Sequence, residues 1–537
     1  MLSQQRIFEV ASAFAGRSRV LVLTGAPALL LVSACAVGPD FKKPAPPPVN
    51  SYTAGPVQPT PAAAGVMGGD AQHFLSGSDV PGDWWTLFHS KALNDLIEAG
   101  LQNNPGLKAA EASLRQAHEQ ALAQRGAFFP AVSAGLGASR QQQSNVLAPT
   151  LTSNALIYNL YTPQISVSYA PDVFGLTRRT VESAEAQADA ARYQMLAVYT
   201  TLVDNLVATA VEDASTEAQI EATSRVIESD TKSVQILEYQ HDKGYASGVD
   251  LAAMRSQLAA AQASLPPLVK QEAQFHDQLA VLAGKYPSQQ SQESLKLDDL
   301  KLPEELPLSL PSALVAQRPD VLQAEANLHA ASAQIGVAVA NRLPNLQLTA
   351  NAGAMAVAFN QLFTPGSEFW TIGAALTAPI FQGGALYHQE KAARAAYDAA
   401  AEQYRGTVLA AFQNVADTLV ALDQDAKGLK AAAAADRAAK TTLDLVQRQL
   451  QDGYTNYLGL LNAQTAYQQA EIALVQAEAS RYADTAALFQ ALGGGWWHWI
   501  RTPRASRRPQ QPTRQPKPRS ISCSVSCRTA TRIRSRF

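Results

Sequence analysis

The chain carries the same pattern of residues twice, and this duplication limits its fold more than any other feature. The segment NNPGLKAAEASLRQA begins at Asn103, and QRPDVLQAEANLHAA begins at Gln317. Pro130 matches Pro344 at the same offset of 214, so one register holds from the start of these segments to the prolines. Similarity at a fixed offset is typical of a chain built from structural repeats.

The register resumes farther along the chain, where GY at 244–245 matches GY at 453–454 at an offset of 209. We therefore expect two structural repeats separated by a linker. The predicted segments are a signal peptide over 1–34, a lipidated leader and equatorial segment over 35–92, a first repeat over 93–285, a linker over 286–309, a second repeat over 310–497, and a basic, disordered tail over 498–537.

Each repeat predicts the same order of elements: a helix of about 23 residues, two strands, a very long helix, and a returning helix of about 34 residues after the Gly-Tyr turn. In the strands, apolar residues alternate with Ser, Thr, Gly and Gln. A soluble sandwich shows the same alternation, but small polar residues on one face and strands of ten or more residues favour a membrane-crossing barrel with a wet lumen. The predicted strands span about 130–143, 158–171, 344–359 and 367–380.

Four strands cannot close a barrel, because about eight is the smallest number whose interior is filled. The open edges must pair with other copies of the chain, and three copies supply twelve strands. A heptad pattern along 251–282 indicates that the helices pair as coiled coils. The expected fold is an α+β membrane protein, with a trimeric 12-stranded transmembrane β-barrel continued by a long periplasmic α-helical barrel. Pro266-Pro267 should bend or break the returning helix.

The first forty residues predict export and a lipid anchor. Three arginines precede an apolar run over 20–32 that is too short to span a bilayer, which is the architecture of a signal peptide. The run ends in Val-Ser-Ala before Cys35, which resembles a bacterial lipobox whose cysteine carries fatty acyl chains such as palmitate. An ordinary signal peptide with an incidental cysteine is the alternative. Ala36 in place of Asp favours the outer membrane over the inner one.

Charge and motif content exclude several classes of function. The formal net charge is −2, and residues 501–537 hold eleven basic side chains and no acidic one, so the rest of the chain is acidic and nucleic acid is not an expected partner. The eight histidines are scattered, and no zinc-protease, P-loop or dinucleotide motif occurs. Cys523 and Cys527 lack the further ligands of a zinc site. We expect no catalytic residue, no metal and no cofactor, so the energy for transport must come from a partner.

CAVGPD from Cys35, PDVFGLTRR from Pro171, PIFQGG from Pro379 and the duplicated halves together resemble the outer membrane factor family, in its NodT-like lipoprotein branch, over about 35–497. The resemblance implies a trimeric duct in outer membrane lipid, which forms the exit of a tripartite efflux pump. Its periplasmic tip would contact an adaptor protein, and an inner-membrane transporter, expected to be of the RND type, would drive it. A type I protein secretion duct and a non-conducting coiled-coil scaffold are the alternatives, although a scaffold has no use for four amphipathic strands.

The resemblance also implies a periplasmic gate at the two Gly-Tyr turns. Asp250 in GYASGVDLAAM matches a gate carboxylate, and its simpler interpretation is an acid in the first turn of a helix. In GYTNYLGLLNAQ, Asn462 and Gly459 stand where relatives place Asp, and Thr455 stands where some place Arg. The expected gate residues are Tyr245, Asp250, Tyr454, Thr455, Leu458 and Asn462, and the expected adaptor-contact turns contain Gly244, Gly248 and Gly453.

Overall fold

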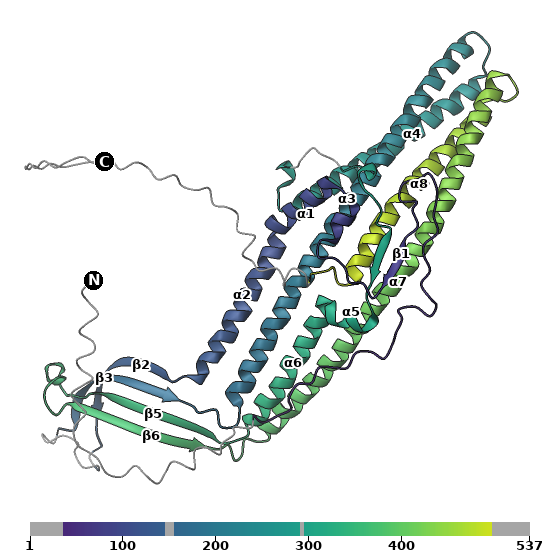
Figure 1. The fold of residues 1–537 in the computed structure, drawn as a ribbon. Helices are drawn as coiled ribbons and strands as arrows, with labels where there is room; N and C mark the ends of the chain where they lie inside the picture. The colour runs from purple at the N-terminus through teal and green to yellow at the C-terminus, as the bar shows by residue number, and fades with distance from the viewer. Residues whose placement is uncertain (1–35, 145, 147–154, 290–294, 497–537) are drawn as a thin grey trace, which may run out of the picture.

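The computed structural model describes residues 36–144, 146, 155–289 and 295–496 (Figure 1). The predicted signal peptide, Cys35 and the basic tail with Cys523 and Cys527 lie outside these residues. The described chain is elongated, with a four-stranded sheet at one end and two helical hairpins at the other (Figure 1). A second, two-stranded parallel sheet lies near the middle of the molecule.

The two halves of the chain contain the same elements in the same order. The first half comprises α1 (Lys91–Asn103), α2 (Pro105–Arg125), β2 (Ala131–Gln142), β3 (Ile157–Tyr169), α3 (Leu176–Asp242) and α4 (Gly248–Leu282). The second half comprises α5 (Pro311–Gln317), α6 (Pro319–Ala340), β5 (Asn345–Ala354), β6 (Glu368–Thr377), α7 (Ala385–Gln451) and α8 (Tyr457–Ala491). The small sheet pairs β1 (His73–Ser76) with β4 (Glu305–Leu308).

The four-stranded sheet is antiparallel in the order β2-β3-β5-β6, so the β3–β5 pair joins the two halves of the chain. Residues paired across the four strands form rows, and successive rows lie on opposite faces of the sheet because side chains in a strand alternate between faces. Here these rows are alternately apolar and polar. One row contains Val132, Val167, Ala350 and Ile372, and the next contains Ser133, Ser166, Asn351 and Thr371. One face of the sheet is therefore apolar and the other is polar.

Both long helices have 67 residues and both returning helices have 35. α3 is the central helix, since it contacts α1, α2, α4, α6 and α8. Its middle part, around Leu206 and Val207, is fully buried in a core that also takes Trp84, Phe88 and Phe489. By length and composition α3 is the one described helix that could cross a membrane, but 56% of the qualifying stretch is buried inside the protein.

α4 runs without interruption through Pro266 and Pro267, so the prolines do not break it. Each proline removes one backbone donor and leaves the carbonyl one turn earlier without its helical partner. Those carbonyls belong to Gln262 and Ala263, which are exposed like the prolines themselves, so water can hydrogen-bond to them. Of the predicted bend or break, the break is therefore wrong, since α4 continues past both prolines.

Candidate functional site

The first tip turn ends the long helix α3 with a glycine. Gly244 has φ of +78°, and the N–H groups of Gly244 and Tyr245 donate to the carbonyls of His241 (2.9 Å) and Gln240 (2.8 Å). This is the Schellman arrangement, in which a left-handed residue satisfies the last carbonyls of a helix. A residue with a side chain would be strained at that φ, so Gly244 sets where α3 stops.

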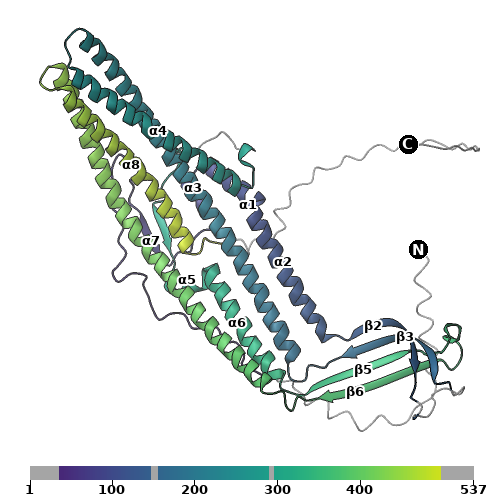
Figure 2. The ribbon, with the colours of Figure 1, turned by 180° about the vertical axis from the view of Figure 1, so that it is seen from behind.

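The second tip turn repeats this geometry. Gly453 has φ of +78°, and the N–H of Tyr454 donates to the carbonyl of Gln449 at 2.8 Å. The two turns lie next to each other at the end of the molecule farthest from the large sheet (Figure 2). Tyr245 and Tyr454 are 85% and 84% exposed, so neither ring packs within the single chain.

Asp250 is held locally as a helix-capping acid. Ser247 precedes α4, and its hydroxyl accepts the N–H of Asp250 (3.1 Å) and donates to the Asp250 carboxylate (2.8 Å). Gly248 is the first residue of α4. In the second turn, the side chain of Asn456 accepts the N–H of Gly459 in the same way at 3.0 Å. The carboxylate of Asp250 thus has a structural role in one chain, as its simpler interpretation predicts.

The other expected gate residues lie on the returning helix α8 and on the turn before it. Leu458 is 53% exposed and Asn462, one turn later on the same face, is also exposed. Thr455 is half-buried, and a β-carbon added at Gly459 would lie 2.7 Å from its hydroxyl oxygen. In a single chain, this face of the tip, with the apolar Leu458 and the polar Asn462, is therefore exposed to solvent.

A small apolar cluster below the turns ties the two hairpins together. Val234, Leu237, Leu251 and Met254 are buried there, with Tyr457 and Leu461 packed against them. The phenol of Tyr457 donates to Gln240 Oε1 at 2.5 Å, which joins α8 to α3. Sequence reasoning missed this bond, because the partners are 217 residues apart and only the tyrosine's need for a polar partner hinted at it.

Asp230 is an unusual group on α3 below this cluster. It is fully buried, and neither carboxylate oxygen has a hydrogen-bond partner among the described residues. Burial raises the pKa of Asp230 to about 6, because desolvation disfavours the charged form. The pKa of Asp204 on the same helix is raised to about 6 for the same reason. The packing of α3 therefore includes carboxylates that destabilise the folded state when they are charged.

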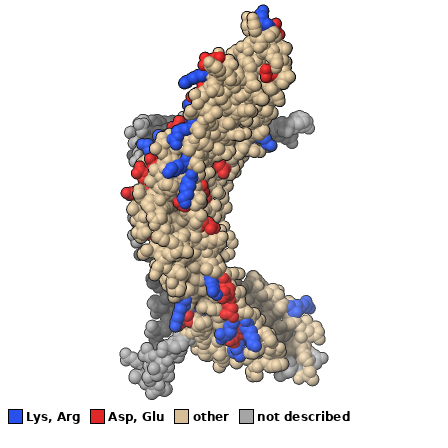
Figure 3. All heavy atoms as spheres, turned by 90° about the vertical axis from the view of Figure 1, so that its right-hand side faces the viewer, with Lys and Arg blue, Asp and Glu red and all other residues tan. Residues whose placement is uncertain are grey.

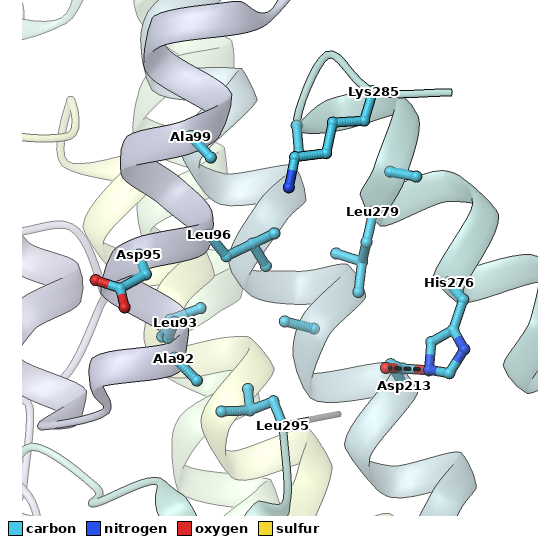
Figure 4. Close-up of a pocket in the computed structure, with 13 residues that line it drawn as sticks. Ala92, Leu93, Asp95, Leu96, Ala99, Asp213, His276, Leu279, Lys285 and Leu295 are labelled. Carbon is cyan, nitrogen blue, oxygen red and sulfur yellow. Dashed lines mark ion pairs between the residues drawn. The ribbon is translucent and has the colours of Figure 1, made fainter. Parts of the chain in front are cut away.

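A cavity of about 210 Å³ lies between α1, α3 and α4 in the middle of the molecule (Figure 4). Its walls are mainly leucine and alanine, and Asp213 and His276 form an ion pair of 3.2 Å at its edge. Burial raises the pKa of Asp213 to about 6, although His276 opposes this shift. No group of three acidic, histidine or cysteine side chains that could hold a metal occurs within the part of the chain described by the structure.

Charged side chains gather where the helices meet the large sheet. On the face seen in Figure 3, Lys, Arg, Asp and Glu cluster next to the sheet and along the middle helices, whereas the outer part of the hairpins carries few. The pairs near the sheet include Arg125–Glu185 (2.6 Å), Arg178–Asp172 (3.2 Å) and Arg394–Glu390 (2.8 Å). On this face the charges therefore concentrate at the junction of helices and sheet and along the middle helices.

A two-faced antiparallel sheet joined to long helical hairpins is the architecture of an outer-membrane channel, and comparisons with known proteins agree. A family model described as outer membrane efflux protein matches residues 96–285 and 310–494. The chain belongs to this family. Membership confirms the predictions of an efflux channel rather than an enzyme and of a location in the outer membrane.

Individual relatives support the same assignment. The chain is 30% identical over 450 residues to the pyoverdine export outer membrane protein OpmQ of Pseudomonas putida, covering 82% of this chain and 94% of the relative. It is 29% identical over 472 residues to the probable efflux pump outer membrane protein TtgC of Pseudomonas putida, covering 87% and 94%. The outer-membrane channel OprN superposes with a TM-score of 0.77 at 26% identity, over 86% of this chain and 100% of that one.

Replacing the buried carboxylate should stabilise the helical body. Because the folded-state pKa of Asp230 lies above its ordinary value of 3.8, wild-type stability should rise as the pH falls through about 6 towards 4. Asp230→Asn should therefore be more stable than wild type by about 1–2 kcal/mol at pH 7.5, and this gain should vanish near pH 4. Circular dichroism during thermal unfolding measures it. Glu228→Gln, an exposed control on the same helix, should show no such gain, and an equal response of both variants would contradict the assignment.

Proposed function

We propose that the chain forms a homotrimeric duct in the outer membrane, which is the exit of a tripartite efflux pump. In this role it passively conducts small molecules, delivered by a periplasmic adaptor and an inner-membrane transporter of the RND type, to the exterior. The observation that carries the proposal is a two-faced sheet with open edges, continued by helices of 67 residues. At 1.5 Å per residue such a helix is about 100 Å long, which suits a duct that reaches deep into the periplasm.

The two open edges of the large sheet are evidence for a trimer. Within the described residues, β2 (12 residues) and β6 (10 residues) each pair with a strand on one side only. An open edge of this length exposes a row of backbone donors and acceptors, which in a bilayer have no water to satisfy them. Pairing β6 of one copy with β2 of the next closes the barrel, and three copies give the twelve strands needed for a lumen.

The side chains of the sheet support a membrane crossing. Val132, Ile165 and Ile372, on the apolar face, are 68%, 54% and 76% exposed in the single chain. Phe381 near the helical end of the sheet and Phe363 near its far end are each 87% exposed. Apolar outward residues between two aromatic levels are typical of a transmembrane barrel. The polar face would then line the lumen.

The tip supports a gate formed between subunits. Tyr245, Tyr454 and Leu458 are 85%, 84% and 53% exposed in one chain, and three copies around an axis would remove part of this surface from water. Asp250, Thr455 and Asn462 would supply polar contacts at this ring. The turns at Gly244, Gly248 and Gly453 would remain outermost, where the adaptor docks. Each exposed polar contact contributes only about 0–1 kcal/mol, so adaptor binding could open such a gate.

The amino-terminal leader supports a lipid anchor at Cys35. Ala36, the first described residue, lies against Gly175, just before α3 and next to the large sheet. A cysteine directly before Ala36 would therefore start its acyl chains near the membrane surface. Two or more acyl chains give stable anchoring, in addition to the hold provided by the barrel.

A type I protein secretion duct is the alternative within the same architecture. The names of the relatives favour small molecules, since they include pyoverdine export and toluene efflux proteins of Pseudomonas putida. Co-purification of the adaptor together with its inner-membrane transporter would separate the two, because an RND transporter supports efflux and an ABC transporter supports secretion.

The two faces of the sheet should respond differently to charge. Ile372→Lys places an ammonium on the apolar face, where it should cost about 2–4 kcal/mol in lipid and reduce the yield of trimers in the outer membrane. Thr371→Lys, on the neighbouring polar row, should assemble normally and change only the ion selectivity. Trimer yield on native gels of membrane extracts measures the difference. Normal assembly of Ile372→Lys would contradict the membrane-facing assignment.

The gate should control conductance. Asn462→Asp adds a carboxylate from each subunit, so cation selectivity should rise, and Asp250→Ala removes a cap and a polar contact, so the closed tip should open more often. Single-channel recordings in planar bilayers compare both variants with wild type. The gate assignment fails if conductance and selectivity are unchanged in both, and the duct itself fails if trimers never conduct with the tip turns forced apart.

The anchor should depend on the cysteine thiol. Cys35→Ser should abolish incorporation of labelled fatty acid, while the barrel keeps the protein in the outer membrane. Undiminished labelling of the variant would rule out acylation at this residue.

A further inference from the structure

The start of the leader occupies a built site at the base of α3. The guanidinium of Arg179, whose side chain is 4% exposed, donates to the carbonyls of Val37 (3.0 Å) and Gly38 (3.4 Å) and to Asp40 Oδ1 (2.7 Å). Its remaining partner is Glu182 at 2.7 Å. A buried cation is stable only when its donors are satisfied. Three of these four acceptors come from the leader, so Arg179 is matched to this segment.

The backbone of the leader also approaches the helices too closely for side chains to intervene. A β-carbon added at Gly38, where φ is +93°, would lie 2.4 Å from Cα of Gly336 on α6. A β-carbon at Gly175 would lie 2.6 Å from Cα of Ala36. The N–H of Val37 donates to the carbonyl of Phe174 at 3.1 Å. Glycine on both sides of the Gly38–Gly336 contact, and on one side of the Gly175–Ala36 contact, allows this approach.

A second contact fixes the next part of the leader on α6. The ring of Phe41 stacks on His329, with centroids 4.3 Å apart and planes 16° from parallel. His329 Nε2 lies 3.0 Å from Glu182 Oε1, so Glu182 contacts both Arg179 and His329. Lys43 then forms an ion pair of 3.0 Å with Glu325. The site thus holds the leader by hydrogen bonds, close backbone packing and an aromatic contact.

We propose that Arg179, Glu182, His329 and Gly336 form a docking site for the processed amino terminus, which holds Ala36 against Gly175 at the sheet end of α3. The role of Cys35 as a lipid anchor rests on the proposed function. Successive Cα atoms are about 3.8 Å apart, so acyl chains on Cys35 would start directly beside docked Ala36. The anchor is then part of the duct's base rather than the end of a loose tether.

The rate of trypsin cleavage after Lys42 in the intact, full-length trimer tests the docking. Gly38→Ala disturbs the contact from the leader side, leaves the helical body unchanged, and should accelerate this cleavage at least tenfold. Gly55→Ala is the matched control on the same leader, since a β-carbon there meets nothing within 4 Å, and its rate should equal that of wild type. Arg179→Gln should act like Gly38→Ala. Cleavage at the wild-type rate in both variants would overturn the docking site.

Cys35→Ser, exported with a non-lipoprotein signal peptide, separates the site from the lipid. Protection of Lys42 should persist in this variant, because the site recognises leader residues rather than acyl chains. Loss of protection would mean that the lipid holds the leader in place, which would overturn the proposal. If wild type itself fails to incorporate labelled fatty acid while Lys42 stays protected, the lipid anchor is wrong and the docking site stands.

Discussion

The pairing of β3 with β5 is the contact on which the rest of the architecture depends. It joins residues of the two halves in one register, from Gln164 opposite Gly353 to Tyr169 opposite Leu348. A shift by one residue would move every apolar side chain of one half to the polar face. The observed register instead continues the apolar row across all four strands. With the strands joined in this way, α3, which follows β3, and α6, which precedes β5, meet the same end of the sheet and pack against each other.

Buried polar groups inside the helical body tie the leader to it. Asp230 is buried and has no hydrogen-bond partner among the residues that the structure describes. Arg481 is fully buried and donates to the carbonyls of Gly68, Asp70 and Leu422. Arg481 binds the later part of the leader, as Arg179 binds its start. Buried charges are costly unless they are paired, so the leader is integral to the folded body. The tip, by contrast, is held together in one chain by a small apolar cluster and few polar bonds.

The turns and helix ends at the tip could be predicted from sequence, because the residues that form them are close together in the chain. The glycines at 244 and 453 stop the long helices because both adopt positive φ, and Ser247 and Asn456 start the returning helices as caps. These effects act within one turn of helix, so the residues concerned are adjacent in the sequence. Family membership could likewise be inferred, because the motifs recur in a fixed order along the chain. The gate residues were inferred from resemblance alone, and in one chain most of them remain exposed.

By itself, the sequence determined the order of the long elements in each half, the alternation that gives the sheet two faces, and the turns at the tip, but it did not indicate α1, α5 or the small β1–β4 sheet. The tertiary structure decided which distant groups meet. Arg179 reaches Val37 and Asp40 across about 140 residues of chain, and Tyr457 reaches Gln240 across 217. Only the packing of α3 determined that Asp230 is buried, and only the exposed surface around Pro266 allowed α4 to continue. Local preferences depend on neighbours in the chain, whereas burial and polar pairing depend on how separate elements pack.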